Sequence, residues 1–401
     1  MVVSPFRSLT LSLLVLPPLL LATYFMSAFP SPPEPLFIHQ SLASLPPAAK
    51  IWSIYPEDFY PGGNYASFPN GKVRYWLMGP ENGKKVVLIH GLSIPSIVWR
   101  DIAPTLAARG YRVLLYDLYG RGYSDAPHTT YDTRLYTSQL AFLMQYLRWE
   151  KANIIGLSMV RDFPGSSAVA HSSQGGGIAA AFTAQFPHLV DDAVGFIASG
   201  GLIEVRVRVP SPRVYSDLLL SSYILRILIH RTRPANLLFQ SEDISRTAKF
   251  MSSPLVIMMA STRPIQKYLQ HLTNQTASQA TNDTANNPIV DVVRLQSAHL
   301  SGYNHALSSS LREGPIRGLT AAFQSPAFAG KRVLLVHGTK DRTVPPKYST
   351  RIMKHLPKDA KAKLITVEGA GHDVNISDSE VVAQAILGLL STPTKDWNEK
   401  S

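Results

Sequence analysis

Residues 153–159 read Asn-Ile-Ile-Gly-Leu-Ser-Met (NIIGLSM), a short apolar run that ends in Gly-x-Ser. The run predicts a buried strand over Asn153–Gly156, with Ser158 on the turn that follows it. A serine on a sharp strand-to-helix turn is presented for attack on a carbonyl group, but the strand and the helix nearly touch there, so both flanks need small residues. Gly156 meets this requirement, whereas Val160 occupies the second flank. Ser158 is therefore the candidate nucleophile, and Val160 is a departure from the pattern.

Two further candidates follow predicted strands nearer the C-terminus. Asp341 lies after the predicted strand Arg332–His337, and His372 lies after Lys363–Val367, both beside glycines. In serine hydrolysis a histidine takes the proton of the serine hydroxyl, and a carboxylate orients and stabilises that histidine. Substrates bind beyond the carboxyl ends of parallel strands, so the order Ser, Asp, His after three such strands predicts a catalytic triad.

The predicted strand Lys85–His90 ends in His90-Gly91-Leu92. In a site of this kind the backbone N–H groups of Leu92 and Met159 are expected to form the oxyanion hole. The side chain of His90 is interpreted as structural. The chemistry needs no metal and no organic cofactor, and the sequence assigns no substrate-binding residues.

Apolar strand runs alternate with helical patterns along most of the chain. This alternation predicts an α/β fold with a mostly parallel, eight-stranded sheet covered by helices on both faces. It stops between about Gly201 and Gly330, a stretch interpreted as a helical cap inserted after the sixth strand. The expected helices in the core include 99–109, 135–149, 175–186 and 381–390. The expected organisation is a hydrophobic anchor (1–30), a Pro-rich linker (31–50), the first part of the core (51–204), the cap (205–330), the second part of the core (331–392) and a tail (393–401).

These features resemble the α/β-hydrolase superfamily, in particular its capped esterase-like and carbon–carbon-bond hydrolases. The similarity covers the core from about Tyr60 to Leu390, without much of the cap. It is carried by residues 86–127, 153–159, 175–187, 333–345 and 367–373. The loop 117–125 (DLYGRGYSD) matches the family's loop after the fourth strand and is interpreted as structural.

The resemblance implies a serine hydrolase acting on a small or medium carbonyl substrate, such as a carboxylic ester. Epoxide hydrolases and haloalkane dehalogenases of the superfamily use an aspartate nucleophile, which Ser158 argues against. The carbon–carbon hydrolases use the same triad as the esterases, so cleavage of a carbon–carbon bond stays open as an alternative.

Two segments interrupt the family pattern. Val160–Gln174 separates Met159 from Gly175, so the helix that should begin at the serine begins late; Val205–Gln240 is rich in Arg and has no Lys. Both segments begin with Val and end with Gln, whose codons can supply the GT and AG boundaries of an intron. We interpret both as retained introns, with genuine insertion as the alternative. If the first segment is native, a catalytically inactive binding protein of this fold is the rival function.

Composition limits the class of protein further. The 401 residues include no cysteine, which excludes disulfides, cysteine-based zinc sites and a cysteine nucleophile. The formal net charge is +12, but Lys and Arg are scattered and no nucleic-acid motif is present. We therefore expect a small-molecule substrate and no nucleic-acid partner.

The N-terminus predicts a membrane anchor. Leu9–Phe29 has no charged residue and is long enough to span a bilayer as a helix. Arg7 precedes it and the next Lys or Arg is Lys50, so the positive-inside rule predicts a single-pass protein with a lumenal or extracellular catalytic domain. Secretion after cleavage of a signal peptide is the alternative.

Some residues outside the triad are also of interest. His299, Tyr303 and His305 of the cap could face the substrate, although packing or solvent contact is the favoured interpretation of each. Asn274, Asn282 and Asn375 begin glycosylation sequons, which would matter only in a lumenal domain. Asn375 lies close to His372, so its use is not expected.

Overall fold

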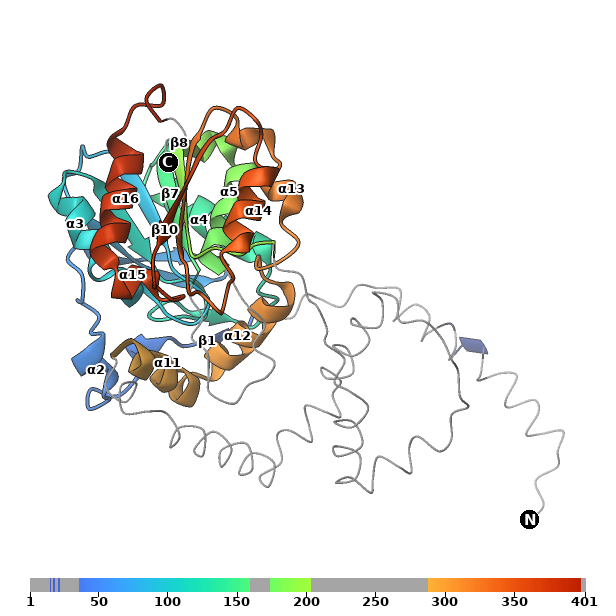
Figure 1. Cartoon of the computed structure of the whole chain (residues 1–401). Coiled ribbons are helices and arrows are strands. Elements are labelled where there is room, and N and C mark those ends of the chain that lie inside the picture. The colour runs from blue at the N-terminus through green and yellow to red at the C-terminus, as the bar shows by residue number, and fades with distance from the viewer. Residues whose placement is uncertain are drawn as a thin grey trace, which may run out of the picture.

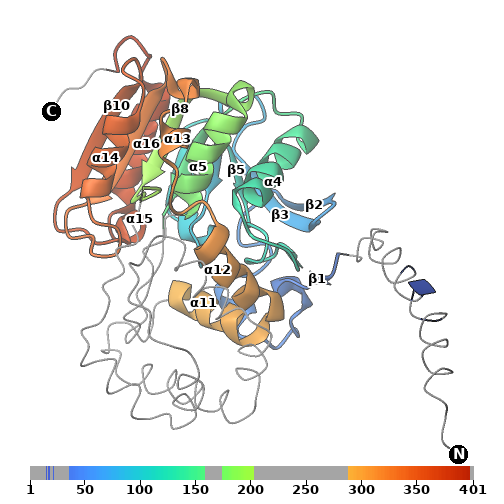
Figure 2. The ribbon, with the colours of Figure 1, turned by 90° about the vertical axis from the view of Figure 1, so that its right-hand side faces the viewer.

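The structure is a computed structural model that describes residues 36–158, 174–202 and 288–397, together with Val15, Pro17, Pro18 and Leu21. Eight strands form one sheet, with helices against both faces (Figures 1 and 2). In spatial order they are β10 (Lys361–Val367), β9 (Arg332–Gly338), β8 (Val190–Ile197), β7 (Ala152–Leu157), β4 (Lys85–Ile89), β5 (Arg112–Tyr116), β3 (Gly71–Met78) and β2 (Gly63–Phe68). β3 runs antiparallel to both of its neighbours, β2 and β5, and the other adjacent strands pair in parallel. The predicted eight-stranded, mostly parallel sheet is confirmed.

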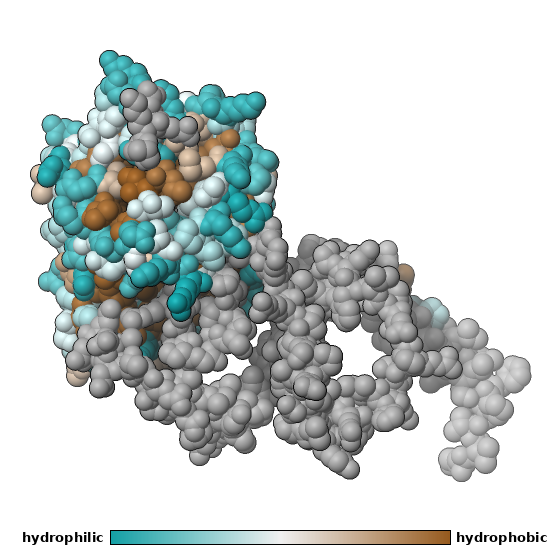
Figure 3. All heavy atoms as spheres, viewed as in Figure 1, coloured by the Kyte–Doolittle hydropathy of each residue, from teal (hydrophilic) through white to brown (hydrophobic). Residues whose placement is uncertain are grey.

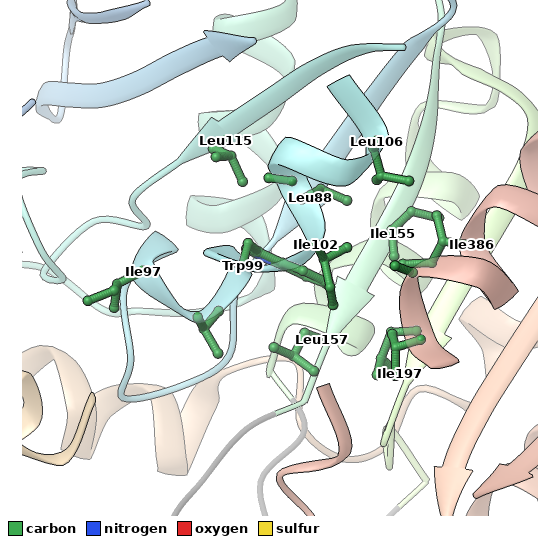
Figure 4. Close-up of a cluster of buried hydrophobic side chains, with 14 of the residues drawn as sticks. Leu88, Ile97, Trp99, Ile102, Leu106, Leu115, Ile155, Leu157, Ile197 and Ile386 are labelled. Carbon is green, nitrogen blue, oxygen red and sulfur yellow. The ribbon is translucent and has the colours of Figure 1, made fainter. Parts of the chain in front are cut away.

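The central strands are largely apolar because both faces of the sheet are covered there. Successive side chains of a strand point to opposite faces. Accordingly, Val86 and Leu88 of β4 belong to one buried cluster, and Val87 and Ile89 belong to the other. Figure 4 shows part of the first cluster, in which the fully buried Trp99 lies among aliphatic side chains. The labelled partners are Leu88, Ile97, Ile102, Leu106, Leu115, Ile155, Leu157, Ile197 and Ile386.

Two helices pack on the first face of the sheet and three on the second. The first pair is α3 (Ile102–Ala108) and α16 (Ser379–Ser391), and the others are α4 (Thr133–Tyr146), α5 (Gln174–Gln185) and α14 (Lys347–His355). α4 begins two residues before the predicted Leu135 because the Asp132 side chain caps it, accepting from Leu135 N at 2.9 Å. It ends three residues before the predicted Trp149, since Arg148 adopts a φ of 56°.

Shorter elements join these layers. They are η1 (Leu42–Ser44), α2 (Ile51–Ile54), η2 (Ser96–Trp99), η3 (Pro187–Leu189), η5 (Pro326–Phe328) and α15 (Val374–Ser377).

Helices also occupy the described part of the predicted cap. They are α11 (Pro288–His299), α12 (Ser301–Glu313) and α13 (Thr320–Phe323), which follow β8, the sixth strand of the large sheet, and precede β9, the seventh. α11 and α12 lie together at one end of the sheet, near α2 (Figures 1 and 2). Residues 203–287, which include the segment 205–240, lie outside the described residues. The proposed domain boundaries and a lid above Ser158 therefore stay predictions.

The second half of the predicted Pro-rich linker packs on the core. β1 (Ile38–His39) pairs with β6 (Ala126–Pro127), and Leu42 is fully buried with its N–H bonded to Gly122 O at 3.0 Å. Lys50 Nζ lies 2.8 Å from Asp291 Oδ2 of α11. The predicted anchor, apart from four isolated positions, lies outside the described residues. Among the residues that are described, no helix combines the length and apolarity needed to cross a membrane.

The surface of the core is mostly hydrophilic in the view of Figure 3, with a smaller apolar area near the middle of that face. Such a distribution is ordinary for a folded protein, since apolar atoms contribute much of any protein surface.

Candidate active site

Ser158 lies immediately after β7, whose six residues are all buried. The serine is itself fully buried, and its N–H donates to Ile197 O of β8 at 2.9 Å. This bond extends the β7–β8 pairing by one residue and fixes the backbone of Ser158 at the carboxyl end of the sheet. Met159 and residues 160–173 lie outside the described residues.

The chain resumes at Gln174, the first residue of α5, directly against the end of β7. A Cβ atom on Gly175 would overlap the carbonyl oxygens of Leu157 and His90, and one on Gly156 would overlap the backbone of Gly175. The close strand–helix approach expected at the turn is therefore made by Gly156 and Gly175. The helix begins within one residue of the predicted Gly175.

Gln174 is a polar residue in a fully buried position at the start of α5. Among the described residues, neither Nε2 nor Oε1 of its side chain has a hydrogen-bond partner. A buried amide without partners costs about 1–3 kcal/mol of stability.

Asp341 follows β9 and accepts hydrogen bonds on both carboxylate oxygens. Oδ1 accepts from the N–H groups of Thr343 at 2.9 Å and Val344 at 2.8 Å. Oδ2 lies 2.7 Å from His372 Nδ1 and 3.1 Å from His337 Nε2. Burial alone would raise the pKa of Asp341, but the hydrogen bonds from His337 and His372 outweigh burial and lower the pKa to about 2. Asp341 is therefore ionised at neutral pH.

His372 lies in the loop after β10 and joins Asp341 to Ser158. Its Nδ1 faces Asp341, and its Nε2 lies 3.5 Å from Ser158 Oγ. The end of β9 touches the loop after β10, since a Cβ atom on Gly338 would overlap the Ala370 carbonyl. The structure thus brings together Ser158, His372 and Asp341. Because Asp341 is ionised, Nδ1 of His372 donates to it, and Nε2 is left to accept a proton from the serine hydroxyl.

His337 was not assigned a role from the sequence, although it lies at the end of the strand that leads to Asp341. It is fully buried, with Nε2 2.7 Å from Val344 O and Nδ1 2.7 Å from Ser349 Oγ. Both neighbours of Nε2, Val344 O and Asp341 Oδ2, are acceptors, so Nε2 carries the proton and Nδ1 accepts from Ser349. His337 therefore contacts the same carboxylate oxygen, Asp341 Oδ2, as His372 does. Its place four residues before Asp341, beside Gly338, was the available signal.

His90 fixes the first peptide group of the expected oxyanion loop. Leu118 N donates to His90 Nε2 at 2.9 Å, which leaves Nδ1 as the donor to Gly91 O at 2.8 Å. Burial lowers the pKa of His90 to about 3, so the ring is neutral. The bonded Gly91 carbonyl belongs to the same peptide group as the Leu92 N–H. Leu92 is buried after β4, while the second expected donor, Met159, lies outside the described residues.

The remaining candidates have defined places. Tyr303 is buried and donates to Ser93 O at 3.0 Å, His305 stacks on His128 with ring centroids 4.5 Å apart, and His299 is exposed. Asn375 is buried and donates to Val98 O at 3.1 Å. Asn274 and Asn282 lie outside the described residues.

No metal centre is visible in the part of the chain that the structure describes. Within residues 36–158, 174–202 and 288–397, no group of three His, Cys, Asp or Glu side chains is arranged to hold a metal ion.

A model of the alpha/beta hydrolase family matches residues 86–385 of the chain. The chain belongs to this family. The resemblance inferred from the sequence motifs is thereby confirmed.

The individual relatives match only part of the chain or have low sequence identity. An uncharacterized protein of Mycobacterium bovis is 32% identical over 121 residues, which are 30% of this chain and 30% of that protein. The chain thus matches less than a third of that relative's length. Among solved structures, an enol-lactonase from Burkholderia xenovorans has a TM-score of 0.51 at 17% identity, covering 82% of this chain and 100% of that one. A meta-cleavage product hydrolase from Pseudomonas fluorescens has a TM-score of 0.50 at 19% identity, covering 82% and 97%. At these identities the likeness to the two structures shows a shared fold alone.

Proposed function

We propose that this chain is a serine hydrolase that cleaves a small or medium carbonyl substrate, such as a carboxylic ester, with Ser158, His372 and Asp341 as its catalytic triad. The observation that carries the proposal is the relay from the Asp341 carboxylate through the His372 imidazole to the Ser158 hydroxyl, with separations of 2.7 and 3.5 Å. A serine–histidine separation of 3.5 Å is compatible with this role, since catalytic hydrogen bonds often shorten when substrate binds.

In this mechanism the Ser158 oxygen attacks the carbonyl carbon while His372 Nε2 takes the hydroxyl proton. Asp341 stabilises the resulting imidazolium through the Nδ1 bond. The backbone N–H groups of Leu92 and Met159 would stabilise the tetrahedral oxyanion. His372 then returns the proton to the leaving-group oxygen, which leaves an acyl-enzyme. Water, activated by the same imidazole, releases the acid and restores Ser158.

The family supplies two reaction classes that use this set of side chains. The enol-lactonase is a structural neighbour on the ester side, and the meta-cleavage product hydrolase is a neighbour on the carbon–carbon side. We favour ester cleavage, because it requires only the groups described above. A panel of activated esters, lactones and vinylogous diketones, assayed with the chain and with its Ser158→Ala variant, tests this. Ester turnover that persists in Ser158→Ala would contradict the proposal.

We also propose that the functional protein lacks residues 160–174. Two observations support this: Gly175 makes the close approach that the turn requires, and Gln174 buries an unpaired amide beside it. The rival, an inactive binding protein, would keep the segment and bind carbonyl ligands without turnover.

A membrane-bound location remains a proposal that rests on residues 9–29. Protease protection in sealed microsomes tests it: a lumenal domain should resist digestion until detergent is added. Digestion without detergent would contradict the orientation.

A further inference from the structure

The loop after β4, residues 91–94, is buried although it has no regular secondary structure. We call it the oxyanion loop, because it includes Leu92. Buried backbone carbonyls need hydrogen-bond partners, and an irregular loop cannot find them in a strand or helix ladder. The donors that this loop uses therefore indicate what holds it in place.

The carbonyl of Ser93 is held by two cap side chains. Tyr303 Oη of α12 donates to it at 3.0 Å, and Gln296 Nε2 of α11 donates at 3.3 Å. Both side chains are buried. The two donors come from separate helices, so the Ser93 carbonyl keeps both bonds only while α11 and α12 lie against the core.

The neighbouring carbonyl of Leu92 is tied to the cap indirectly. Arg121 Nε donates to Leu92 O at 2.7 Å, and Arg121 Nη2 donates to Ser310 Oγ of α12 at 3.0 Å. Gln296 links α11 to the loop 117–125 as well, because its Oε1 accepts a hydrogen bond from Gly122 N at 2.7 Å. The loop 117–125, α11, α12 and the oxyanion loop thus share one buried network.

These bonds constrain consecutive peptide groups. His90 holds the group that carries the Leu92 N–H, Arg121 holds the next one, and Tyr303 with Gln296 holds the one after that. A hydrogen-bonded carbonyl fixes the plane of its peptide group, and the three planes are joined through shared Cα atoms. Loss of the cap donors would release the third plane and loosen the first.

We propose that Tyr303 and Gln296 are positioning residues for the oxyanion hole, through which the cap aims the Leu92 N–H at the reacting carbonyl. The inference rests on the proposed serine hydrolase function and adds that an undocked cap leaves one oxyanion donor misplaced. Catalysis is sensitive to such errors, since a displacement of about 1 Å can cost on the order of 100-fold in rate.

Tyr303→Phe in the full chain tests the proposal, because it removes the hydroxyl alone. Tyr131→Phe is the matched control: Tyr131 is also fully buried, and its hydroxyl donates to a backbone carbonyl, Pro127 O, at 2.9 Å. With an activated ester we expect Tyr303→Phe to lower kcat at least about 10-fold and to change KM less than about 2-fold. The affinity for a boronic acid, which presents a tetrahedral oxyanion, should fall by a similar factor. Tyr131→Phe should leave kcat, KM and boronic acid affinity unchanged.

Equal losses of kcat in Tyr303→Phe and Tyr131→Phe would overturn the inference, as would a change in KM alone. Gln296→Met serves as the second variant if Tyr303→Phe does not fold, with the same expected pattern. Ser158→Ala separates this inference from the proposed function. Hydrolysis that survives Ser158→Ala removes the proposed function, and the inference falls with it. Ser158-dependent hydrolysis that Tyr303→Phe leaves intact removes the inference alone.

Discussion

Deleting residues 160–174 should improve both the stability and the activity of the chain. The deletion removes Gln174, whose buried amide has no partner in the part of the chain that the structure describes, and joins Met159 to Gly175. Removal of that unpaired amide should add about 1–3 kcal/mol to the free energy of unfolding. At roughly 2–4 °C per kcal/mol for a domain of this size, Tm should rise by about 2–12 °C. The junction also returns the Met159 N–H to the start of α5, and one oxyanion donor is typically worth about 100- to 1,000-fold in kcat.

Thermal unfolding and hydrolysis of a small activated ester measure the two effects. Gln174→Met in the undeleted chain separates them, because it removes the unpaired amide and keeps the interruption. It should raise Tm as the deletion does and leave kcat near that of the parent chain. If the undeleted chain is as active as the deleted one, or if mature transcripts retain these codons, the segment is a true insertion and our reasoning about it is wrong.

Three other changes have defined expectations. Asp341→Asn should lower kcat by about 10,000-fold, because an uncharged amide cannot hold His372 in the required tautomer; normal turnover of an activated ester by this variant would rule out Asp341 as the acid of the triad. Acid should destabilise the protein through His90, because the pKa of this histidine is about 3 in the folded protein and 6.5 in the unfolded chain. The neutral ring therefore contributes its full stabilisation above pH 6.5, and this contribution is lost as the pH falls towards 3. Unfolding measured from pH 7 to pH 4 should then show a steeper loss in the parent than in His90→Asn, and identical slopes would refute the assignment. Gly175→Ala should lower both Tm and activity, since the new Cβ would overlap the carbonyl oxygens of Leu157 and His90. Gly388→Ala is the control and should change neither, because a Cβ there meets no described atom within 4 Å. Equal effects of the two substitutions would contradict the close contact at Gly175.

The sequence was sufficient for the parts of the fold in which local pattern and burial agree. β4, β7 and β9 are buried on both faces, so their sequences are largely apolar, and they were located from sequence to within a few residues. The edge strand β2 was missed because it pairs on one side only, and most of its side chains are exposed or half-buried. β1 and β6 have two residues each, too few to show any period.

The same distinction applies to the candidate site: residues beside predicted strands were found from the sequence, and roles that depend on tertiary contacts were not. Ser158, Asp341 and His372 each stand directly after a recognisable strand, and the parallel order of the sheet brings them to one edge. His337 escaped notice because its role depends on contacts with Val344 and Ser349 that no spacing rule describes. Tyr303 was noticed as a residue that could face the substrate, but its partner, Ser93 O, is 210 positions away in the chain. Contacts of this range depend on how the cap sits on the core, which local sequence does not encode.

The pairing of β8 with β9 has a consequence for the history of this gene. The chain leaves the sheet at Ile197 and returns at Arg332 in the adjacent strand. The two strands can therefore pair whatever the length of the chain between them. Because the entropy of closing a flexible loop grows only with the logarithm of its length, a doubling costs about 0.6 kcal/mol. An insertion between these strands, as we propose for residues 205–240, can therefore persist at little thermodynamic cost. The contact between Gly156 and Gly175 does not tolerate such changes in length, because the backbones of β7 and α5 meet there without room for a Cβ atom. Selection should therefore tolerate length changes in the cap while removing those at the turn, so homologous genes should vary in length between β8 and β9 and not between Ser158 and α5.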